Sequence, residues 1–285
     1  MSVRRERSSF GDGDGKRVKD SEVLFKNPLC SYIFKYVIRT NLCFLCNHYL
    51  DIMTSVFNIV FLIGLEGTGH HLFADSCNFK ETRLLHRLLL EYFDTSTNID
   101  VKSKIKNRIY DFTKHNTGKV HIDRASFPFG RPTNPLKCYD ILEFYELFNS
   151  MPHVSLFFIV LIRDIVRSTL SSHNRFDKSK SIILSARQQE NCLIYINSQI
   201  QLIPERVYVI VDFNDIVNNI SDFEKVLLKK SGMTITFDPS KIKLPDDSKH
   251  LRDNNYNYLK NYFGEVRTSQ FSFLYNNAHS FAPLS

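Results

Sequence analysis

The sequence predicts an α/β fold in which helices cover both faces of a parallel sheet. Two mainly apolar runs, residues 56–63 and 154–162, have the composition of strands that are buried on both faces. Segments with helical periodicity alternate with these and with two weaker strand-like runs. Since each connection is long enough to contain a helix, the strands are expected to run parallel in a three-layer arrangement.

The elements follow in order along the chain. Strands are expected at 56–63, 118–123, 155–162 and 206–212, and helices at about 70–92, 100–115, 136–149, 164–175, 181–202, 222–231 and 250–263. Glycines end the first strand, and a leucine-rich helical pattern follows them. Asp164 suits the N-cap of the helix after the third strand, and Gly232 suits the end of the helix at 222–231.

A chain of 285 residues can hold one large domain with short extensions. Residues 1–20 are charged and rich in Gly and Ser, which predicts a disordered tail. Residues 21–54 form an apolar, cysteine-containing N-terminal extension, residues 55–265 the main domain, and residues 266–285 a loose C-terminal tail. The cysteines have no spacing typical of a disulfide framework.

The apolar stretch at 29–50 follows basic residues, which is the order seen in a membrane anchor. Polar and charged residues interrupt it, so a helix packed on the domain is favoured over a membrane span. The cytoplasm and the Golgi lumen both remain open as compartments. Cys30, Cys43, Cys46 and His48 fit no standard zinc spacing, so no metal is expected.

The net charge of +7 suits a polyanionic ligand. The basic residues are scattered along the sequence rather than clustered in a stripe, and no motif for RNA or DNA binding is present. No nucleic-acid partner is therefore expected.

A glycine-rich turn follows the first predicted strand and has the spacing of the phosphate-loop pattern G-x-x-x-x-G-K-[ST]. It runs from Gly64 through Gly67, Thr68 and Gly69 to His70 and His71. Such a turn lets backbone N–H groups converge on an anion. His70 stands where the lysine of the pattern would be, and His71 where the magnesium-binding hydroxyl would be. The turn therefore suits phosphate-like oxygens but lacks an ordinary Mg·ATP site.

A second pair of residues follows the third predicted strand. Arg163 lies at the carboxyl end of that strand, and Ser171 lies eight residues later in the next helix. Ligands collect at this edge of open α/β sheets. A guanidinium and a hydroxyl in these positions can hold one phosphate from two sides. A surface charge and a solvated helix residue are the alternative interpretation of each residue taken singly.

Together the two segments resemble the sulfotransferase superfamily, whose members have a P-loop-containing nucleoside triphosphate hydrolase fold and use 3′-phosphoadenosine 5′-phosphosulfate (PAPS). The resemblance implies that Gly64, Gly67, Thr68, Gly69, His70 and His71 bind the 5′-phosphosulfate. It implies that Arg163 and Ser171 bind the 3′-phosphate. Residues 206–216 are similar to a later strand and turn of that family.

The departures from the family pattern concern catalysis more than binding. Gly67 stands where the family has Lys or Arg, the group that stabilises the bridging oxygen as the sulfuryl group leaves. His70 and His71 replace hydroxyl residues, and Ile165 replaces a proline. A protonated histidine in the turn would restore a positive charge.

The resemblance also implies a base that takes the proton of the acceptor. His121, in a strand that is similar to the family's K-T-H-L, is one candidate, and Glu66 or Asp123 is the alternative. A structural histidine is an equally open interpretation of His121. The acceptor would be a hydroxyl or amine on a carbohydrate, a protein tyrosine or a small molecule, and the sequence does not choose among them.

The function that the sequence favours is therefore sulfuryl transfer from PAPS by in-line displacement without a metal. A catalytically silent relative that only binds nucleotide is one alternative, for which Gly67 is the argument. A nucleotide kinase or NTPase with a phosphate loop is the other. It needs a loop lysine, which is absent, and an acidic magnesium ligand, for which Asp212 is the candidate.

Overall fold

The structure is a computed structural model, and it describes residues 56–78, 82–94, 99–127, 139–176, 178–242 and 248–280. The expectations for the tail at 1–20 and the extension at 21–54, including the stretch at 29–50 and its cysteines, lie outside the described residues. The side chains of His70 and His71 do so as well.

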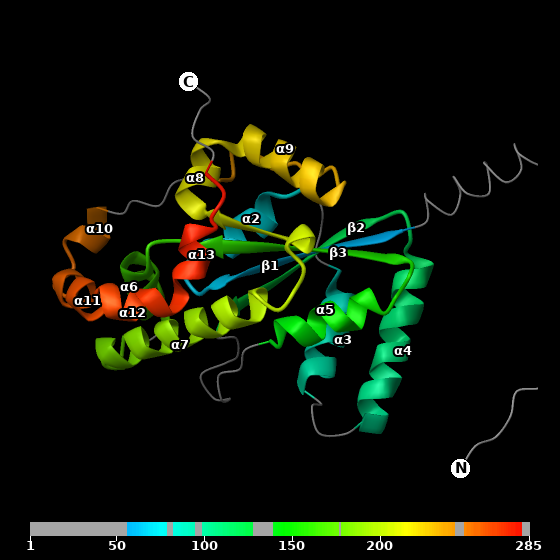
Figure 1. The fold of residues 1–285 in the computed structure, drawn as a ribbon, viewed down its shortest axis with the longest axis horizontal. Helices are drawn as coiled ribbons and strands as arrows, with labels where there is room; N and C mark the ends of the chain where they lie inside the picture. Colours follow the sequence, from blue (N-terminus) through cyan, green and yellow to red (C-terminus); the bar gives the residue numbers. More distant parts are fainter. Residues whose placement is uncertain are drawn as a thin grey trace, which may run out of the picture. The chain divides into compact units, whose positions relative to one another are not determined.

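A parallel sheet with the strand order β2-β1-β3-β4 forms the centre of the domain (Figure 1). The strands are β1 (Phe57–Leu65), β2 (Val120–Phe127), β3 (Val154–Ile162) and β4 (Tyr208–Asp212). β1 and β3, the two central strands, are the two strongest apolar runs of the sequence. Their burial on both faces explains why they are continuously apolar.

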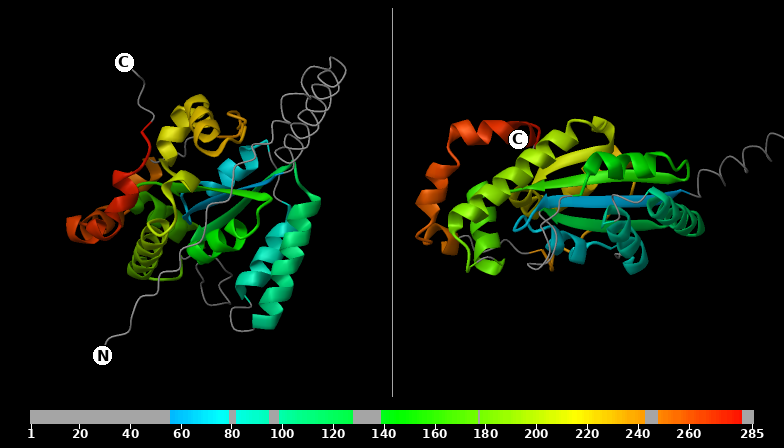
Figure 2. Two further views of the ribbon diagram at one scale, coloured as in Figure 1. Left: turned by 45° about the vertical axis from the view of Figure 1, so that its right-hand side comes forward. Right: turned by 90° about the horizontal axis from the view of Figure 1, so that it is seen from below.

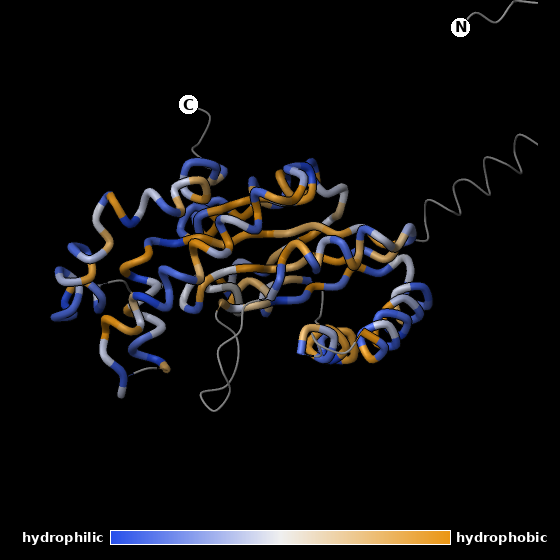
Figure 3. Tube along the Cα trace, turned by 60° about the horizontal axis from the view of Figure 1, so that its bottom comes forward, coloured by the Kyte–Doolittle hydropathy of each residue, from blue (hydrophilic) through white to orange (hydrophobic). Residues whose placement is uncertain are grey.

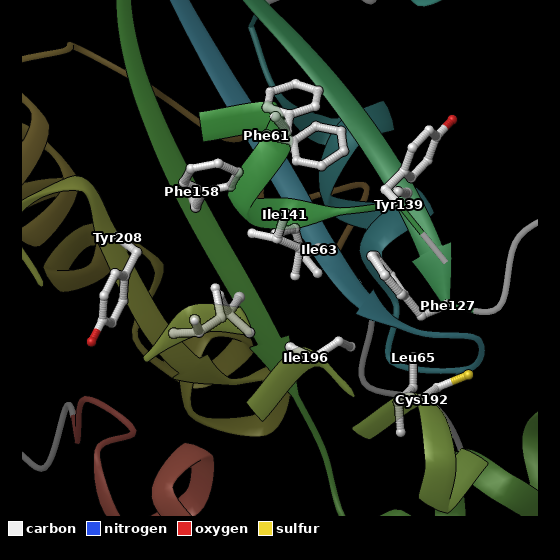
Figure 4. Close-up of a cluster of buried hydrophobic side chains, with 14 of the residues drawn as sticks. Phe61, Ile63, Leu65, Phe127, Tyr139, Ile141, Phe158, Cys192, Ile196 and Tyr208 are labelled. Atoms are coloured by element: carbon white, nitrogen blue, oxygen red, sulfur yellow. The ribbon is translucent and has the colours of Figure 1, made fainter. Parts of the chain in front are cut away.

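Side chains of β1 alternate between two hydrophobic cores, one on each face of the sheet. Phe61 and Ile63 belong to the first core, and Val60 and Leu62 to the second. In the first core, Phe61 stacks on Phe144 with ring centroids 4.1 Å apart (Figure 4 shows this cluster). Burying one such ring contributes about 1.5–3 kcal/mol.

Helices cover both faces, as the sequence predicts (Figure 2). The first core is covered by α3 (Arg83–Asp94), α4 (Ile99–His115), α5 (Ile141–Asn149), α6 (Ile165–Phe176) and α7 (Ile182–Ile200). The second core is covered by α2 (His70–Ser76), α8 (Phe213–Asn218) and α9 (Ile220–Ser231). Figure 3 shows the strands as mainly hydrophobic between helices of mixed character. The three-layer α/β fold class is confirmed.

The predicted helix at 70–92 is not continuous, which corrects that expectation. α2 ends at Ser76, because Cys77 forms an isolated antiparallel bridge with Phe237. The N–H of Asn78 donates to the carbonyl of Thr236 at 2.9 Å. The chain therefore leaves the helix to pair with a segment far away in sequence, which helical periodicity does not reveal.

The second strand is longer than predicted and ends at Phe127 instead of residue 123. Ala125 and Phe127 are buried in the first core, and Phe127 pairs with Leu65 in the register of the sheet. The strand continues because these alternating side chains still find apolar partners. Phe127, rather than residue 123, therefore marks the carboxyl edge of this strand.

The described part of the C-terminal segment is folded, and the expected loose tail at 266–285 is wrong as far as residue 280. The segment contains α10 (Ser248–Leu251), α11 (Tyr256–Tyr262), α12 (Glu265–Thr268), a 3₁₀ turn η3 (Ser269–Phe271) and α13 (Ser272–Asn276). Phe271 and Leu274 have no exposed surface. These short helices carry little periodic signal, but their apolar side chains complete the first core.

Candidate functional site

The carboxyl ends of three strands bring the predicted binding residues to one edge of the sheet. Gly64, the residue before the last of β1, pairs with Leu161 of β3. Ile162 of β3 pairs with Asp212 of β4. Gly67 follows the first strand, and Arg163 follows the third. In open parallel sheets this edge is where ligands bind.

The turn after β1 depends on two glycines with positive φ angles. Gly67 has φ 91° and Gly69 has φ 88°. Residues with a side chain are strained at such angles, whereas glycine is not. When residues with positive φ alternate with residues of ordinary φ, successive N–H groups turn toward one side. The resulting concave backbone suits an anion. α2 begins at His70 and has only seven residues, so the turn contributes more to this site than a helix dipole does.

Thr68 shapes the turn and does not offer its side chain to a ligand, which corrects its expected binding role. Its hydroxyl and its N–H both donate to the carbonyl of Leu65, at 2.7 and 3.1 Å. The residue is 1% exposed. A Cβ on Gly64 would lie 2.4 Å from the Thr68 hydroxyl oxygen, so Gly64 is needed to make room for it.

Arg163 reaches from the end of β3 to the glycine turn. One Nη1–H of its guanidinium donates to the carbonyl oxygen of Gly67 at 3.1 Å. The side chain is 3% exposed, and the backbone carbonyl of Arg163 accepts a hydrogen bond of 2.9 Å from the Tyr275 hydroxyl. A guanidinium has five N–H donors in a fixed fork, so it can bond to more than one acceptor.

Ser171 lies against the same turn. A Cβ placed on Gly67 would be 3.1 Å from the Cβ and 3.4 Å from the Oγ of Ser171. It would also be 2.7 Å from the carbonyl oxygen of Ser168, one turn earlier in α6. Gly67, Arg163 and Ser171 therefore meet, although they are far apart in the sequence. The same contacts explain why glycine occupies position 67, since a lysine there would collide with the backbone of α6.

Helix α6 is held in this position from its first residue. The side chain of Asp164 accepts a hydrogen bond of 2.9 Å from the N–H of Arg167, which is the N-cap arrangement that the sequence predicts. Leu170 is fully buried in the first core. These interactions fix the face that carries Ser168 and Ser171 against the turn.

Phe213 was not among the predicted site residues, and Asp212 was named only as the candidate magnesium ligand of the kinase alternative. A Cβ on Gly69 would lie 2.2 Å from the Phe213 ring, so this ring packs on the glycine. The same ring centroid is 5.7 Å from Cζ of Arg163. Burial raises the pKa of Asp212, and the nearby Arg163 charge opposes that shift. The similarity of residues 206–216 to the family was the available signal.

The structure does not bring His121 to the glycine turn, and our expectation of proximity is corrected. His121 pairs with Ile59 near the amino end of the sheet, six residues before Phe127, or about 20 Å along the strand. Its ring stacks on Phe57 and its Nδ1 contacts the Thr82 hydroxyl. Burial, and secondarily the charge of Lys119, lower its pKa.

Asp123 is also away from the edge, whereas Glu66 lies within the turn. Asp123 is 4% exposed and is held by Nδ1 of His86 at 2.8 Å. The N–H of Glu66 donates to the carbonyl of Phe127 at 3.1 Å, which joins the turn to the end of β2. The residue that pairs with Gly64 at this end of β2 is Ser126, which sequence analysis did not identify. A correctly placed strand end would have found it.

The described part of the chain shows neither a membrane span nor a metal cluster. None of its helices combines the length and apolar character that a membrane span requires. Within the same ranges, no three His, Cys, Asp or Glu side chains are arranged to hold a metal ion.

Comparisons with known proteins place these features beside distant structures only. No family model matches the sequence, and no curated protein does. A sulfotransferase from Alicyclobacillus acidocaldarius is 9% identical, with a TM-score of 0.45 over 77% of this chain and 96% of that chain. The sulfotransferase domain of the curacin biosynthetic pathway is 10% identical, with a TM-score of 0.42 over 78% of this chain and 97% of that chain.

The sulfotransferase domain of the Synechococcus PCC 7002 olefin synthase is 13% identical, with a TM-score of 0.42 over 78% of this chain and 94% of that chain.

Proposed function

We propose that the protein is a sulfotransferase that moves a sulfuryl group from PAPS to a hydroxyl or amine acceptor, by in-line displacement without a metal. The observation that supports this most is the meeting of Gly67 with Arg163 and Ser171. The Arg163 guanidinium donates to the Gly67 carbonyl at 3.1 Å, and Ser171 lies in contact distance of the same glycine. One bisphosphate nucleotide can span these groups.

The residues of the turn fit an anion bound close to the backbone. The positive φ angles of Gly67 and Gly69 turn N–H groups of the turn toward one side, which suits an anion. A Cβ on either glycine would overlap α6 or the Phe213 ring, so neither position accepts a side chain. Backbone N–H groups of Gly67, Gly69, His70 and His71 would hold the 5′-phosphosulfate. Arg163 and Ser171 would hold the 3′-phosphate, with charge-assisted hydrogen bonds from the guanidinium.

The chain's own contribution to the chemistry would be positioning and proton transfer. When bound, PAPS would supply the activated sulfuryl group. Glu66 is the candidate base in our proposal because it lies in the turn itself and is partly accessible. His121 is not carried forward, since it lies at the other end of the sheet. A base has to come within hydrogen-bond distance of the acceptor, directly or through one water.

A silent relative is the second candidate, and position 67 is the observation that favours it. Gly67 provides no cation beside the bridging oxygen, and the 2.7 Å approach of Ser168 leaves no space for one. Such a protein would bind the nucleotide through the same residues without turnover. The acceptor class and the compartment stay open in both cases.

Binding of adenosine 3′,5′-bisphosphate in the presence of EDTA tests the proposal. Isothermal titration calorimetry of the wild-type chain should show saturable binding without magnesium. Arg163→Lys keeps a charge but loses the planar fork, so the affinity should fall about tenfold or more. Arg108→Ala is the matched control, because Arg108 is a 57% exposed arginine on α4.

Circular dichroism and thermal unfolding of each variant would separate lost binding from lost structure. Binding of Mg·ATP but not of the bisphosphate would favour a kinase and overturn the proposal. Equal affinities of wild type and Arg163→Lys would remove Arg163 from the site. Once binding is shown, transfer of radiolabelled sulfate from PAPS to a panel of phenols, amines and glycans would separate the enzyme from a silent relative.

A further inference from the structure

A cavity lies beside the end of β3, between the start of α6 and the C-terminal helices. Its volume is about 450 Å³, which is within the range of small-molecule sites. Ile165 and Val166 of α6 line it together with Phe263, Phe271 and Tyr275 of the C-terminal segment. In Figure 1, α11, α12 and α13 lie next to α6, in agreement with this lining. The cavity is therefore mainly apolar and ring-lined.

The C-terminal segment, which contributes much of the cavity lining, is attached to α7 by polar interactions. Glu190 of α7 accepts hydrogen bonds of 3.0 Å from Arg267 and 2.8 Å from Tyr262, and it is 6% exposed. Asn197, about two turns after Glu190 in α7, accepts a hydrogen bond of 3.2 Å from the N–H of Leu274. Hydrogen bonds in which one partner is charged are stronger than those between two neutral groups. The segment that lines the cavity is therefore anchored to α7.

The polar lining gives the cavity a different charge preference from the glycine turn. Lys260 contributes one positive charge, and Asp164 and Glu265 contribute two negative charges. Hydroxyls of Thr268, Ser269 and Ser272 supply neutral hydrogen-bonding groups. This net negative lining disfavours a polyanion such as a nucleotide. It favours a neutral or singly cationic molecule whose ring packs on the apolar lining residues.

Tyr275 connects this cavity to the proposed donor site. It lines the cavity, and its hydroxyl donates to the backbone carbonyl of Arg163 at 2.9 Å. Burial raises the pKa of Tyr275, so its hydroxyl stays protonated and remains a donor at neutral pH. The side chain of Arg163 in turn donates to the Gly67 carbonyl. Two hydrogen bonds therefore connect the cavity to the glycine turn, one from Tyr275 to Arg163 and one from Arg163 to Gly67.

We propose that this cavity binds a ring-bearing, neutral or monocationic small molecule, and that Tyr275 links its occupancy to Arg163. The binding part of the proposal stands on the cavity alone. The link rests on the proposed function, because it concerns the residue that would hold the 3′-phosphate. A ligand that tightens the packing around Tyr275 orders the backbone of Arg163 and so favours nucleotide binding.

Ligand-observed NMR titrations without any nucleotide test the binding. Tyrosol is a neutral probe, tyramine a cationic probe of similar shape, and 4-hydroxyphenylacetate an anionic one. Tyrosol and tyramine should bind saturably, and 4-hydroxyphenylacetate should bind at least about tenfold more weakly. Absence of binding by both tyrosol and tyramine overturns the proposal. Equal binding of the anion overturns the charge argument within it.

Blocking the cavity gives the residue-level test. Ser269→Trp introduces a large ring at an exposed position of the lining and should abolish binding of tyramine. Ser198→Trp, on the exposed side of α7, is the matched control and should bind like wild type. Thermal unfolding of both variants shows whether they fold equally well. Undiminished binding by a folded Ser269→Trp places the probe elsewhere and overturns the assignment.

Tyr275→Phe tests the link, because it removes the hydrogen bond to Arg163 and keeps the ring in the cavity wall. In the wild type, saturating tyramine should tighten the binding of adenosine 3′,5′-bisphosphate by about fivefold or more. In Tyr275→Phe tyramine should still bind, but this effect should disappear. Unchanged coupling in the variant contradicts the link. Failure of the bisphosphate to bind at all would count against the proposed function and leave the cavity result unaffected.

Discussion

Gly67→Ala should lower the stability of the folded protein for two reasons, and their contributions can be measured separately. Gly67 has φ 91°, and moving an alanine into this left-handed region costs about 1–2 kcal/mol. The new Cβ would also lie 2.7 Å from the carbonyl oxygen of Ser168 and 3.1 Å from the Cβ of Ser171. Ser168 contributes a helix backbone atom, which cannot move aside like a flexible side chain. Overpacking of this kind costs about 1–3 kcal/mol more.

Gly232→Ala is the matched control for this prediction. Gly232 ends α9 with φ 71°, and a Cβ there would meet nothing within 4 Å. It therefore carries the backbone strain alone, about 1–2 kcal/mol. Urea denaturation of both variants should show Gly67→Ala to be less stable than Gly232→Ala, by the overpacking part of about 1–3 kcal/mol.

Nucleotide binding should separate the two variants further. If the turn moves away from α6 to relieve the contact, the groups around Gly67 and Ser171 no longer hold one ligand in common. Affinity for adenosine 3′,5′-bisphosphate should then fall about tenfold or more in Gly67→Ala. Gly232→Ala should bind like wild type. Equal stabilities and equal affinities of the two variants would refute the close approach of the turn to α6.

Further predictions concern other parts of the domain. Because burial lowers the pKa of His121, the unfolded chain takes up its proton first as the pH falls below about 6.5, so stability should decrease there. His121→Phe should flatten this decrease without weakening nucleotide binding; an unchanged pH profile would contradict it. Leu274→Ala should cost about 2–5 kcal/mol in urea denaturation, because the side chain is fully buried. Val266→Ala, at an 82% exposed position, should cost less than about 0.5 kcal/mol, and similar losses would show that the C-terminal segment is loose. Glu66→Gln should lower kcat for sulfuryl transfer about 10²–10⁴-fold with unchanged bisphosphate affinity; an unaltered kcat would remove Glu66 as the base.

The strands, and the proximity of Gly67, Arg163 and Ser171, could be predicted from the sequence. Apolar runs identify β1 and β3 because both faces of these strands are buried. In a parallel sheet their carboxyl ends share an edge, so Gly67 and Arg163 had to lie near each other. The eight-residue spacing then placed Ser171 on the side of α6 that faces the turn.

The errors arose where distant contacts decide the local structure. The break after Ser76 depends on the bridge between Cys77 and Phe237, which no local pattern encodes. His121 was expected at a strand end, but β2 continues because Phe127 still finds apolar partners. Leu274 belongs to the core although its helix is too short to show periodicity.

A structure of the protein with adenosine 3′,5′-bisphosphate tests the central claim most directly. Our account predicts the 3′-phosphate within hydrogen-bonding distance of the Arg163 guanidinium and the Ser171 hydroxyl, with the 5′-phosphate on the N–H groups that follow Gly67. A bisphosphate bound elsewhere, or a 3′-phosphate held without either side chain, would contradict it.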